Sequence, residues 1–414
     1  MMIRKKSLFA YCIIAAAILS PLFLPSEDCF PQDKIRLVQS IPLETEIGKS
    51  EIENTIDVWL EIVGNAKRTI DIETFYFADQ DNSPLNEFMA SLKSAAGRGV
   101  NVRIIVDSSF YSSNDKSVDL LEGVPNIEIR KIAMRNIAGG VMHAKFFIVD
   151  NETVFAGSQN MDWRALIHIH EIGAVVTDKK LAETFTEIFE TDWKLCEGNL
   201  SGITAMRVNL FVNRENPVVL SDSESGDVEI YPAVSPYEYS MSSLSYELDE
   251  LLRLINESKQ KLNIQVYSYS VKDKSSGGFY AIDSALRNAA ARGVKIRMII
   301  PDWAAKPSAI DAIKELSLVE NIQLKISSIP LYSGGFIPYA RVDHSKFFTA
   351  DDEMSWISTT NWEKNYFYNS RNVSFVVKSK EINKKLSGVF ELWWNSPYSE
   401  FIDVNKQYEE VKRK

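Results

Sequence analysis

Cysteine and histidine are both scarce in this chain of 414 residues, and each scarcity excludes a class of site. The chain has three cysteines, and none of them belongs to a CxxC pair, which argues against a structural zinc site. Cys12 lies in an apolar N-terminal run, so only Cys29 and Cys196 could form a disulfide in the remaining chain. A disulfide framework is therefore excluded, and the hydrophobic core must supply most of the stability.

An excess of basic residues is also absent, because the formal net charge is −10. A global positive field for gripping nucleic acid or anionic lipid is therefore lacking, and any phosphate recognition must be local. Apolar residues make up 45% of the chain and charged residues 25%, which is typical of a folded globular protein. The length is sufficient for one large domain or two medium ones.

The N-terminus has the pattern of an export signal. Arg4, Lys5 and Lys6 precede an apolar run from Leu8 to Leu24 that is interrupted by Pro21. Residues 1–27 are therefore expected to be either a cleaved signal peptide or an uncleaved anchor. Both alternatives place the rest of the chain outside the cytoplasm, in a secreted, periplasmic or lumenal location.

Two of the four histidines stand in the same sequence context. Each is followed by Lys at +2, by Asp at +7, and by Asn at +17. The first copy contains His143, Lys145, Asp150, Ser158 and Asn160, and the second contains His344, Lys346, Asp351, Thr359 and Asn361. Repetition of this spacing argues against two unrelated exposed His-x-Lys pairs.

The repeat extends to the predicted helices and strands around the motif. Helix, strand, helix and strand are expected at 52–66, 68–77, 85–96 and 100–107, and again at 246–258, 261–269, 281–291 and 292–300. The offset between the copies grows from 192 at Ile72 and Ile264 to 201 at His143 and His344. Such stepwise growth is typical of a duplicated unit that gains residues in surface loops.

An apolar strand that follows a helix and a glycine is the second half of a βαβ unit. We therefore predict an α/β fold of two fused, pseudo-two-fold-related units, each a mostly parallel β-sheet flanked by helices. Residues 28–212 are expected to form the first half and 228–414 the second. A linker is expected at 213–227, where Asn, Pro, Ser, Glu and Gly cluster. Each half would supply part of one site, so the halves should be inseparable.

If 141–149 is a strand, His143 and Lys145 lie on the same face of it. Two such strands bring two imidazoles and two ammonium groups into one cleft, which suits a phosphoryl group and needs no metal or other cofactor. One histidine can attack phosphorus, and the other can protonate the leaving alkoxide and later activate water or an alcohol. The residues alone do not assign these roles to one histidine or the other.

The polar residues around the histidines are expected to support this chemistry. The lysines would stabilise charge on the equatorial oxygens, together with donors at Ser158, Asn160, Thr359 and Asn361. Asp150 and Asp351 come at the predicted strand ends, which favours structural or orienting roles near the site.

The doubled His-x-Lys-x4-Asp motif with its Gly-Ser-x-Asn segment resembles the phospholipase D superfamily. Further segments are similar to its membrane-anchored, lumen-facing subfamily: 160–164, 171–173, 292–297, 360–362 and 365–367. The resemblance implies a metal-independent phosphodiesterase with a histidine nucleophile, whose catalytic set is His143, Lys145, Asp150, His344, Lys346 and Asp351. It also implies that His143 is the nucleophile, that His344 is the general acid, and that Glu171 holds a site histidine.

The resemblance leaves the substrate open. Hydrolysis or headgroup exchange of phospholipids is the first hypothesis, and a 5′ exonuclease on single-stranded DNA or RNA is the second. A catalytically inactive phosphate-binding protein is the third, although no His or Lys of the motif is missing. Ser358 departs from the family pattern, which has Gly there, and it either crowds the backbone approach to phosphate or adds a hydroxyl.

Several other residues have more than one interpretation. His168 and His170 alternate along a predicted strand, and an edge pair is favoured over a metal site because a third ligand is lacking. The cluster of Trp362, Tyr366 and Phe367 either belongs to the core or stacks a base or lines a lipid groove. Tyr76 and Tyr267 close matching strands and are expected in the core.

Overall fold

The computed structural model describes residues 34–48, 50–113, 117–198, 211–222, 226–241, 243–273 and 277–412. Residues 33–414 form one compact unit. The apolar run at 8–24, Cys12 and Cys29 lie outside the described residues. None of the described helices is long and apolar enough to cross a bilayer.

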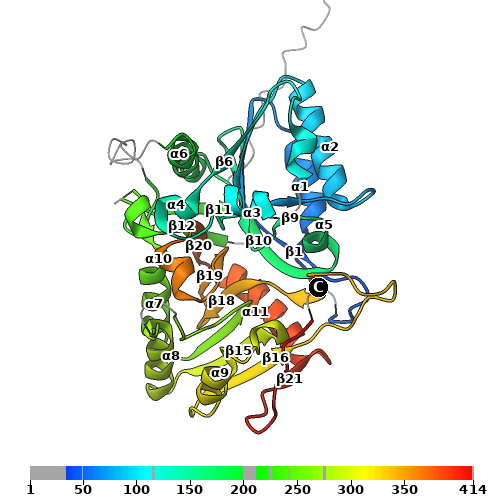
Figure 1. The fold of residues 1–414 in the computed structure, drawn as a ribbon. Helices are drawn as coiled ribbons and strands as arrows, with labels where there is room; N and C mark the ends of the chain where they lie inside the picture. The colour runs from blue at the N-terminus through cyan, green and yellow to red at the C-terminus, as the bar shows by residue number, and fades with distance from the viewer. Residues whose placement is uncertain are drawn as a thin grey trace, which may run out of the picture. The chain divides into compact units, whose positions relative to one another are not determined.

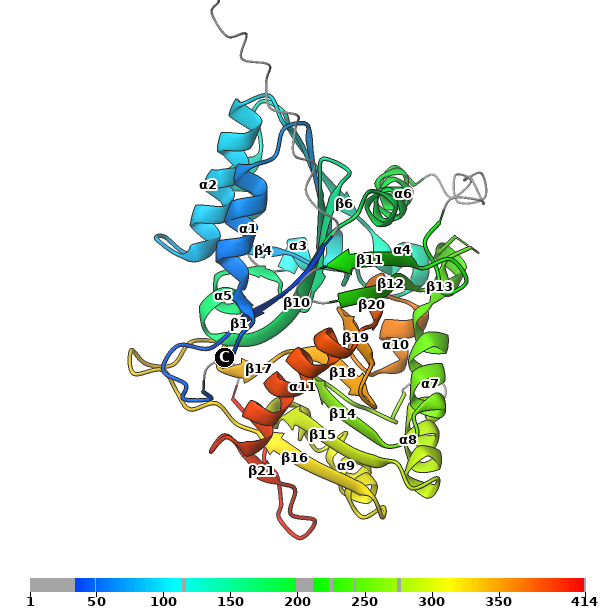
Figure 2. The ribbon, with the colours of Figure 1, turned by 180° about the vertical axis from the view of Figure 1, so that it is seen from behind.

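The first half, coloured from blue to green in Figure 1, is built on a sheet with the strand order β2-β1-β10-β8-β7-β3-β5-β6. Its strands are β1 (Lys34–Ser40), β2 (Glu53–Asn54), β3 (Thr69–Thr74), β5 (Asn101–Asp107), β6 (Ile127–Ile132), β7 (Phe146–Val149), β8 (Thr153–Gly157) and β10 (Ile169–Thr177). Helices α1 (Thr55–Gly64) and α2 (Pro84–Gly97) cover one face of the sheet, and α6 (Lys179–Leu195) lies on the other face (Figure 2).

Local sequence determines where these helices begin and end. The Asn54 side chain accepts a hydrogen bond from the Ile56 N–H at the start of α1. Ser83 caps α2 in the same way and is followed by Pro84, whose missing N–H costs nothing at a first helical position. Gly99 adopts a φ of 94° just after α2, a value that favours glycine. The chain can therefore turn directly into β5.

The second half repeats this order as β12-β20-β19-β18-β14-β15-β16, with β13 beside β12 and with β11 and β21 added at the two edges. Its strands are β11 (Val218–Asp222), β12 (Gly226–Ser235), β13 (Ser245–Tyr246), β14 (Lys261–Val266), β15 (Lys295–Pro301), β16 (Ile322–Ser327), β18 (Lys346–Ala350), β19 (Met354–Ser358), β20 (Asn372–Lys378) and β21 (Ser399–Phe401). Helices α7 (Glu247–Glu257), α8 (Ala281–Ala291) and α11 (Lys380–Asn395) correspond to α1, α2 and α6. The predicted α/β fold of two equivalent units is confirmed.

Both parallel and antiparallel pairs occur in each sheet. Strands β3, β5 and β6 are parallel to one another, as are β14, β15 and β16, so the predicted βαβ connections are present. The strands that follow the two His-x-Lys motifs, β7 and β18, pair in antiparallel fashion with both of their neighbours.

The segment at 213–227 contains β11, which pairs with β12 of the second sheet. Part of the segment predicted as a linker therefore belongs to the second sheet. The limits of the halves at 28–212 and 228–414 stay a prediction.

The two halves exchange main-chain contacts at their centre. The short strand β17 (Val342–Asp343) of the second half pairs in parallel with β10 of the first. At the equivalent place in the first half, Met142 forms an isolated bridge with Arg371 of the second half. Because these contacts immediately precede His143 and His344, each half fixes the histidine segment of the other.

Candidate functional site

Each motif histidine lies between a cross-half contact and the first residues of a strand. The predicted strand at 141–149 is shorter in the structure, because β7 begins only at Phe146. The N–H of His143 donates to the Arg371 carbonyl at 2.9 Å, and the N–H of His344 donates to the His170 carbonyl at 2.9 Å. The backbone before each strand therefore bonds to the opposite half, which ends regular pairing within its own sheet.

The two imidazoles have different partners, each from the other half. Nδ1 of His344 lies 2.9 Å and 3.0 Å from the two carboxylate oxygens of Glu171. Nδ1 of His143 lies 2.9 Å from Oδ1 of Asn372. Residues 171 and 372 are 201 apart, like the two histidines, so they occupy equivalent positions. The structure thus places Glu171 on a site histidine, and its counterpart Asn372 was missed although the constant offset identifies it.

The orientation of the Asn372 amide is fixed by its surroundings. Its Nδ2 donates to the Tyr366 carbonyl at 2.9 Å, and its Oδ1 accepts from Oγ1 of Thr359 at 3.1 Å. Because Oδ1 can only accept, the proton between the two side chains belongs to Nδ1 of His143. Nε2 of His143 therefore carries a lone pair when the imidazole is neutral.

The two motif lysines are fully buried beside the histidines. Nζ of Lys145 donates to the His143 carbonyl at 2.5 Å, and Nζ of Lys346 donates to the His344 carbonyl at 2.7 Å. Burial lowers the pKa of Lys346 to about 7, against the opposing effect of Glu171, and it lowers the pKa of Lys145 well below its usual range. An anion bound next to these lysines would supply further negative charge and would favour their protonated forms.

Burial also shifts the pKa of the histidines and of Glu171. It lowers the pKa of both imidazoles well below 6.5, and the two lysines lower them further. Burial raises the pKa of Glu171 well above 4.5, and Lys346 opposes that shift. Glu171 can share its proton with His344 through their hydrogen bond, whereas His143 has only a neutral amide as partner.

A pocket of about 460 Å³ opens over this centre. His143 and His344 line it together with Asn160 and Asn361, one from each half. Aromatic side chains form most of its remaining wall: Phe75, Tyr76, Phe110, Tyr267, Trp303, Tyr339 and Tyr366. The structure therefore brings residues of both motif copies into one cavity.

The prediction that Tyr76 and Tyr267 belong to the core is wrong. Both follow the last residues of β3 and β14, where the sheet no longer covers them, and both line the pocket. The aromatic cluster of Trp362, Tyr366 and Phe367 lies partly in the core and partly in the pocket wall. Trp362 and Phe367 are buried in the core, while Tyr366 lines the pocket and packs its ring 4.7 Å from that of His143.

Ser158 and Thr359 connect strands beneath the pocket. Oγ of Ser158 donates to the Ile172 carbonyl at 3.1 Å, and Oγ1 of Thr359 accepts from the Val373 N–H at 3.1 Å. Neither residue lines the pocket. They therefore position the strands that carry Glu171 and Asn372.

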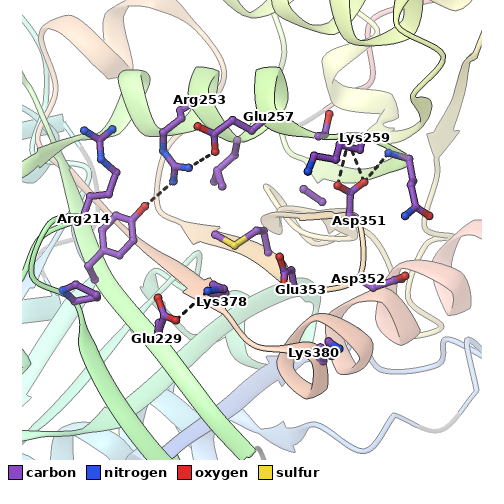
Figure 3. A pocket seen from close by; sticks show the side chains of 17 residues that line it. Arg214, Glu229, Arg253, Glu257, Lys259, Asp351, Asp352, Glu353, Lys378 and Lys380 are labelled. Atoms are coloured by element: carbon purple, nitrogen blue, oxygen red, sulfur yellow. Dashed lines mark hydrogen bonds and ion pairs between the residues drawn. The ribbon is translucent and has the colours of Figure 1, made fainter.

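Asp150 and Asp351, the last members of the motifs, lie outside the pocket. The Asp150 carboxylate accepts from the N–H groups of Lys67, Arg68 and Thr69 at 2.6–3.0 Å. Asp351 binds the backbone of 259–261 in the same way (Figure 3). Each carboxylate thus fixes the turn before β3 or β14, a structural role and not a catalytic one.

Asp351 lines a second pocket of about 760 Å³, which contains neither motif histidine. Basic and acidic side chains alternate around it, and several pair with one another, such as Lys378 with Glu229 and Arg253 with Glu257 (Figure 3). The cations there are largely compensated. This pocket is therefore a weaker candidate for a phosphodiester than the one over the histidines.

Ser358 adds a hydroxyl without crowding the pocket. In the first copy a Cβ at Gly157 would lie 2.3 Å from Oε1 of Gln159 and 2.6 Å from Cα of Gly173. Because the second contact is with backbone, glycine is required there. In the second copy Thr360 replaces that glutamine, and the hydroxyls of Ser358 and Thr360 donate to Glu247 at 2.6 Å and 2.5 Å. Burial raises the pKa of Glu247 to about 7, and these hydroxyls oppose the shift.

His170 belongs to the support of the second motif. Its Nδ1 lies 2.9 Å from the Asp343 carboxylate, and its Nε2 accepts from Trp393 at 3.1 Å. His168 packs against the rings of Trp163 and Tyr332. Among the described residues, no group of three or more His, Cys, Asp or Glu side chains is arranged to hold a metal ion.

Comparison with known proteins matches both halves of the chain to one family. The family model described as "Cardiolipin synthase, PLD-like domain" matches residues 60–193 and 251–394. The 5'-3' exonuclease PLD3 of Xenopus laevis is 30% identical over 406 residues, covering 90% of this chain and 81% of that protein. Phospholipase D Z of Dictyostelium discoideum is 29% identical over 383 residues, covering 88% and 90%.

The fold also matches solved structures of low sequence identity. A phosphatidylserine synthase of Haemophilus influenzae has a TM-score of 0.57 and 11% identity, and the match covers 84% of this chain and 85% of that one. Such low identity supports the shared fold alone.

Proposed function

Because this chain belongs to the phospholipase D superfamily, we propose that it is a phosphodiesterase that forms a covalent phosphohistidine on His143. The unequal partners of the two imidazoles support this division of roles. Asn372 holds His143 with the proton on Nδ1, so Nε2 is available for attack on phosphorus. Glu171 can pass its proton to Nδ1 of His344 through their hydrogen bond, which gives the protonated imidazole that a general acid requires.

The reaction then has two balanced steps. In the first, Nε2 of His143 forms a bond to phosphorus while the bond to the leaving oxygen breaks, and Nε2–H of His344 protonates that oxygen. In the second, water transfers a proton to Nε2 of His344, its oxygen bonds to phosphorus, and the phosphorus–nitrogen bond breaks. An alcohol in place of water gives transfer. Lys145 and Lys346 stabilise the charge on the non-bridging oxygens.

Phospholipids are the first substrate class that we propose. Aromatic side chains form most of the pocket wall outside the histidines and asparagines. The net charge of the chain is −10, which disfavours tight binding of a long polyanion. A 5′ exonuclease on single-stranded DNA or RNA is the second candidate, because the same rings can stack on bases. An exonuclease also needs only a few phosphate contacts.

One panel of substrates tests this function. The wild-type protein, His143→Ala and His344→Ala are each given phosphatidylcholine, phosphatidylglycerol and a 5′-hydroxyl single-stranded oligonucleotide, all in EDTA. We expect the wild type to turn over at least one phospholipid and both variants to be inactive. Shortening of the oligonucleotide alone would favour the exonuclease. Wild-type turnover by both variants, or complete loss of activity in EDTA, would contradict the phosphohistidine mechanism.

A further inference from the structure

The connection between β16 and β17, residues 328–341, presents apolar side chains to solvent beside the catalytic pocket. Leu331 is 67% exposed and Phe336 is 45% exposed. The connection projects away from the second sheet, in dark yellow, next to the blue 41–48 loop (Figure 1 and Figure 2). That loop adds Leu43, also 45% exposed. We call Leu43, Leu331 and Phe336 the apolar rim.

Hydrogen bonds at several points hold this connection in place. Arg341 donates to the Pro330 carbonyl at 2.7 Å and to the Leu43 carbonyl at 2.6 Å, so it joins the two loops. The Ser333 N–H donates to the Glu44 carboxylate at 2.8 Å. Tyr332 and Gly335 form a bridge close to the tip. These hydrogen bonds therefore fix the backbone that carries the apolar rim.

The equivalent connection of the first half is built differently. Residues 133–140 contain the short helix α4 (Met134–Ala138) and are covered by the second half. Nδ2 of Asn369 donates to the Ala138 carbonyl at 2.6 Å, and the Val141 N–H donates to Oγ of Ser370 at 3.2 Å. The longer connection of the second half also bonds to the first half, at Leu43 and Arg164, yet it leaves Leu331 and Phe336 exposed. These exposed apolar residues have no counterpart in the first half.

The connection that carries Leu331 and Phe336 also reaches the pocket. Tyr339, in the same connection as Leu331 and Phe336, lines the pocket and is 39% exposed. Arg164, another lining residue, donates to the Pro338 carbonyl at 3.1 Å. The same connection therefore contributes both to the apolar rim and to the wall of the catalytic pocket.

We propose that the apolar rim enters a phospholipid surface, so that a lipid headgroup reaches the catalytic pocket without leaving the surface entirely. This inference rests on the proposed phosphodiesterase function and assigns its substrate class. Two aliphatic side chains and one ring suit the acyl region, while Tyr339 at the mouth suits the interfacial level. Lys412 lies 5.7 Å from the ring centroid of Phe336 and can meet lipid phosphates.

The same features fit single-stranded nucleic acid less well. Leucine side chains offer bases no ring to stack on and offer phosphates no charge. The guanidinium of Arg164 is held by the Asp162 carboxylate at 2.7 Å, so its charge at the mouth is compensated. Burial of apolar side chains in lipid is also insensitive to salt, in contrast to phosphate contacts.

The test uses residues 33–414, the compact unit that holds both sheets and their hydrophobic cores. The variant is Leu331→Ser/Phe336→Ser. Its matched control is Leu318→Ser/Phe401→Ser, which changes the same residue types at positions 70% and 59% exposed that do not line the pocket. Binding to phosphatidylcholine vesicles is measured by co-sedimentation at low and high salt. Turnover is measured on those vesicles, on a water-soluble phosphodiester and on the oligonucleotide.

Loss of apolar burial is expected to weaken vesicle binding and vesicle turnover by about tenfold or more in the rim variant. Turnover of the soluble diester should stay within about twofold of wild type, and the matched control should behave like wild type. Vesicle binding by the wild type should persist at high salt. Unchanged vesicle binding in the rim variant would overturn the proposal, and so would loss confined to the oligonucleotide. His143→Ala separates the proposed phosphodiesterase function from the proposed lipid binding by the apolar rim. It should bind vesicles normally while losing all turnover.

Discussion

Replacement of Glu171 by Gln tests the division of roles between the two histidines. The Glu171 side chain is fully buried, and both of its oxygens lie within 3.0 Å of Nδ1 of His344. Gln keeps the size of the side chain but removes the charge that favours the protonated imidazole. A hydrogen bond to a charged group contributes about 1.5–3 kcal/mol, which corresponds to about 10- to 150-fold in rate.

The assay compares two phosphodiesters that differ only in their leaving group. An alkoxide needs a proton from His344 in order to leave, whereas p-nitrophenolate does not. In Glu171→Gln, formation of the phosphohistidine should slow about 10- to 150-fold with the alkyl ester and change little with the p-nitrophenyl ester. Single-turnover kinetics measure this step separately from hydrolysis. Equal slowing with both esters would refute the role of His344 as general acid.

Asn372→Asp is the matched change at the equivalent position. It gives His143 a carboxylate partner, which raises the pKa of that imidazole. The nucleophile then becomes protonated at a higher pH, so the acid limb of kcat/KM should move upward for both esters. A limb at the same pH as in the wild type would show that residue 372 does not act on the nucleophile.

Two further predictions follow from buried ionisable groups. Burial keeps the pKa of His143 well below 6.5 and lowers that of Lys346 to about 7. We therefore expect kcat/KM to be highest below pH 7 and to fall above pH 7, where Lys346 loses its charge. Activity that rises steadily to alkaline pH would contradict this. Burial raises the pKa of Glu247 from 4.5 to about 7, so its protonation stabilises the folded state at low pH by at most about 3 kcal/mol, and this contribution is lost as pH rises from 4.5 to 7. Glu247→Gln should therefore raise Tm at pH 8 more than at pH 5, and an equal change at both would contradict the shift.

The repeated features of this protein could be predicted from its sequence. Apolar periodicity placed the predicted helix at 281–291 on the bounds of α8, and the strand at 100–107 matches β5 closely. Two copies of one motif in one chain also required a shared site, because neither copy alone contains two histidines. The structure contains such a shared site, because one pocket is lined by both His143 and His344.

Contacts between the halves could not be predicted from local patterns. The strand at 141–149 alternates correctly, yet its first residues bond to Arg371 of the other half, and no periodicity within the segment reveals that partner. Tyr76 follows an apolar strand, and this position predicts a core residue as long as the end of the sheet is unknown. Asn372 is an intermediate case, since its equivalence to Glu171 can be read from the offset but its contact with His143 cannot.

The central claim is that His143 forms the covalent intermediate, and mass spectrometry of a trapped protein tests it most directly. His344→Ala is mixed with a p-nitrophenyl phosphodiester, whose leaving group needs no acid, and is then digested under alkaline conditions that preserve phosphoramidates. We predict a phosphoryl adduct on His143, which accumulates because the base for hydrolysis is missing. An adduct on a different residue, or a burst of p-nitrophenolate without any adduct, would contradict the mechanism.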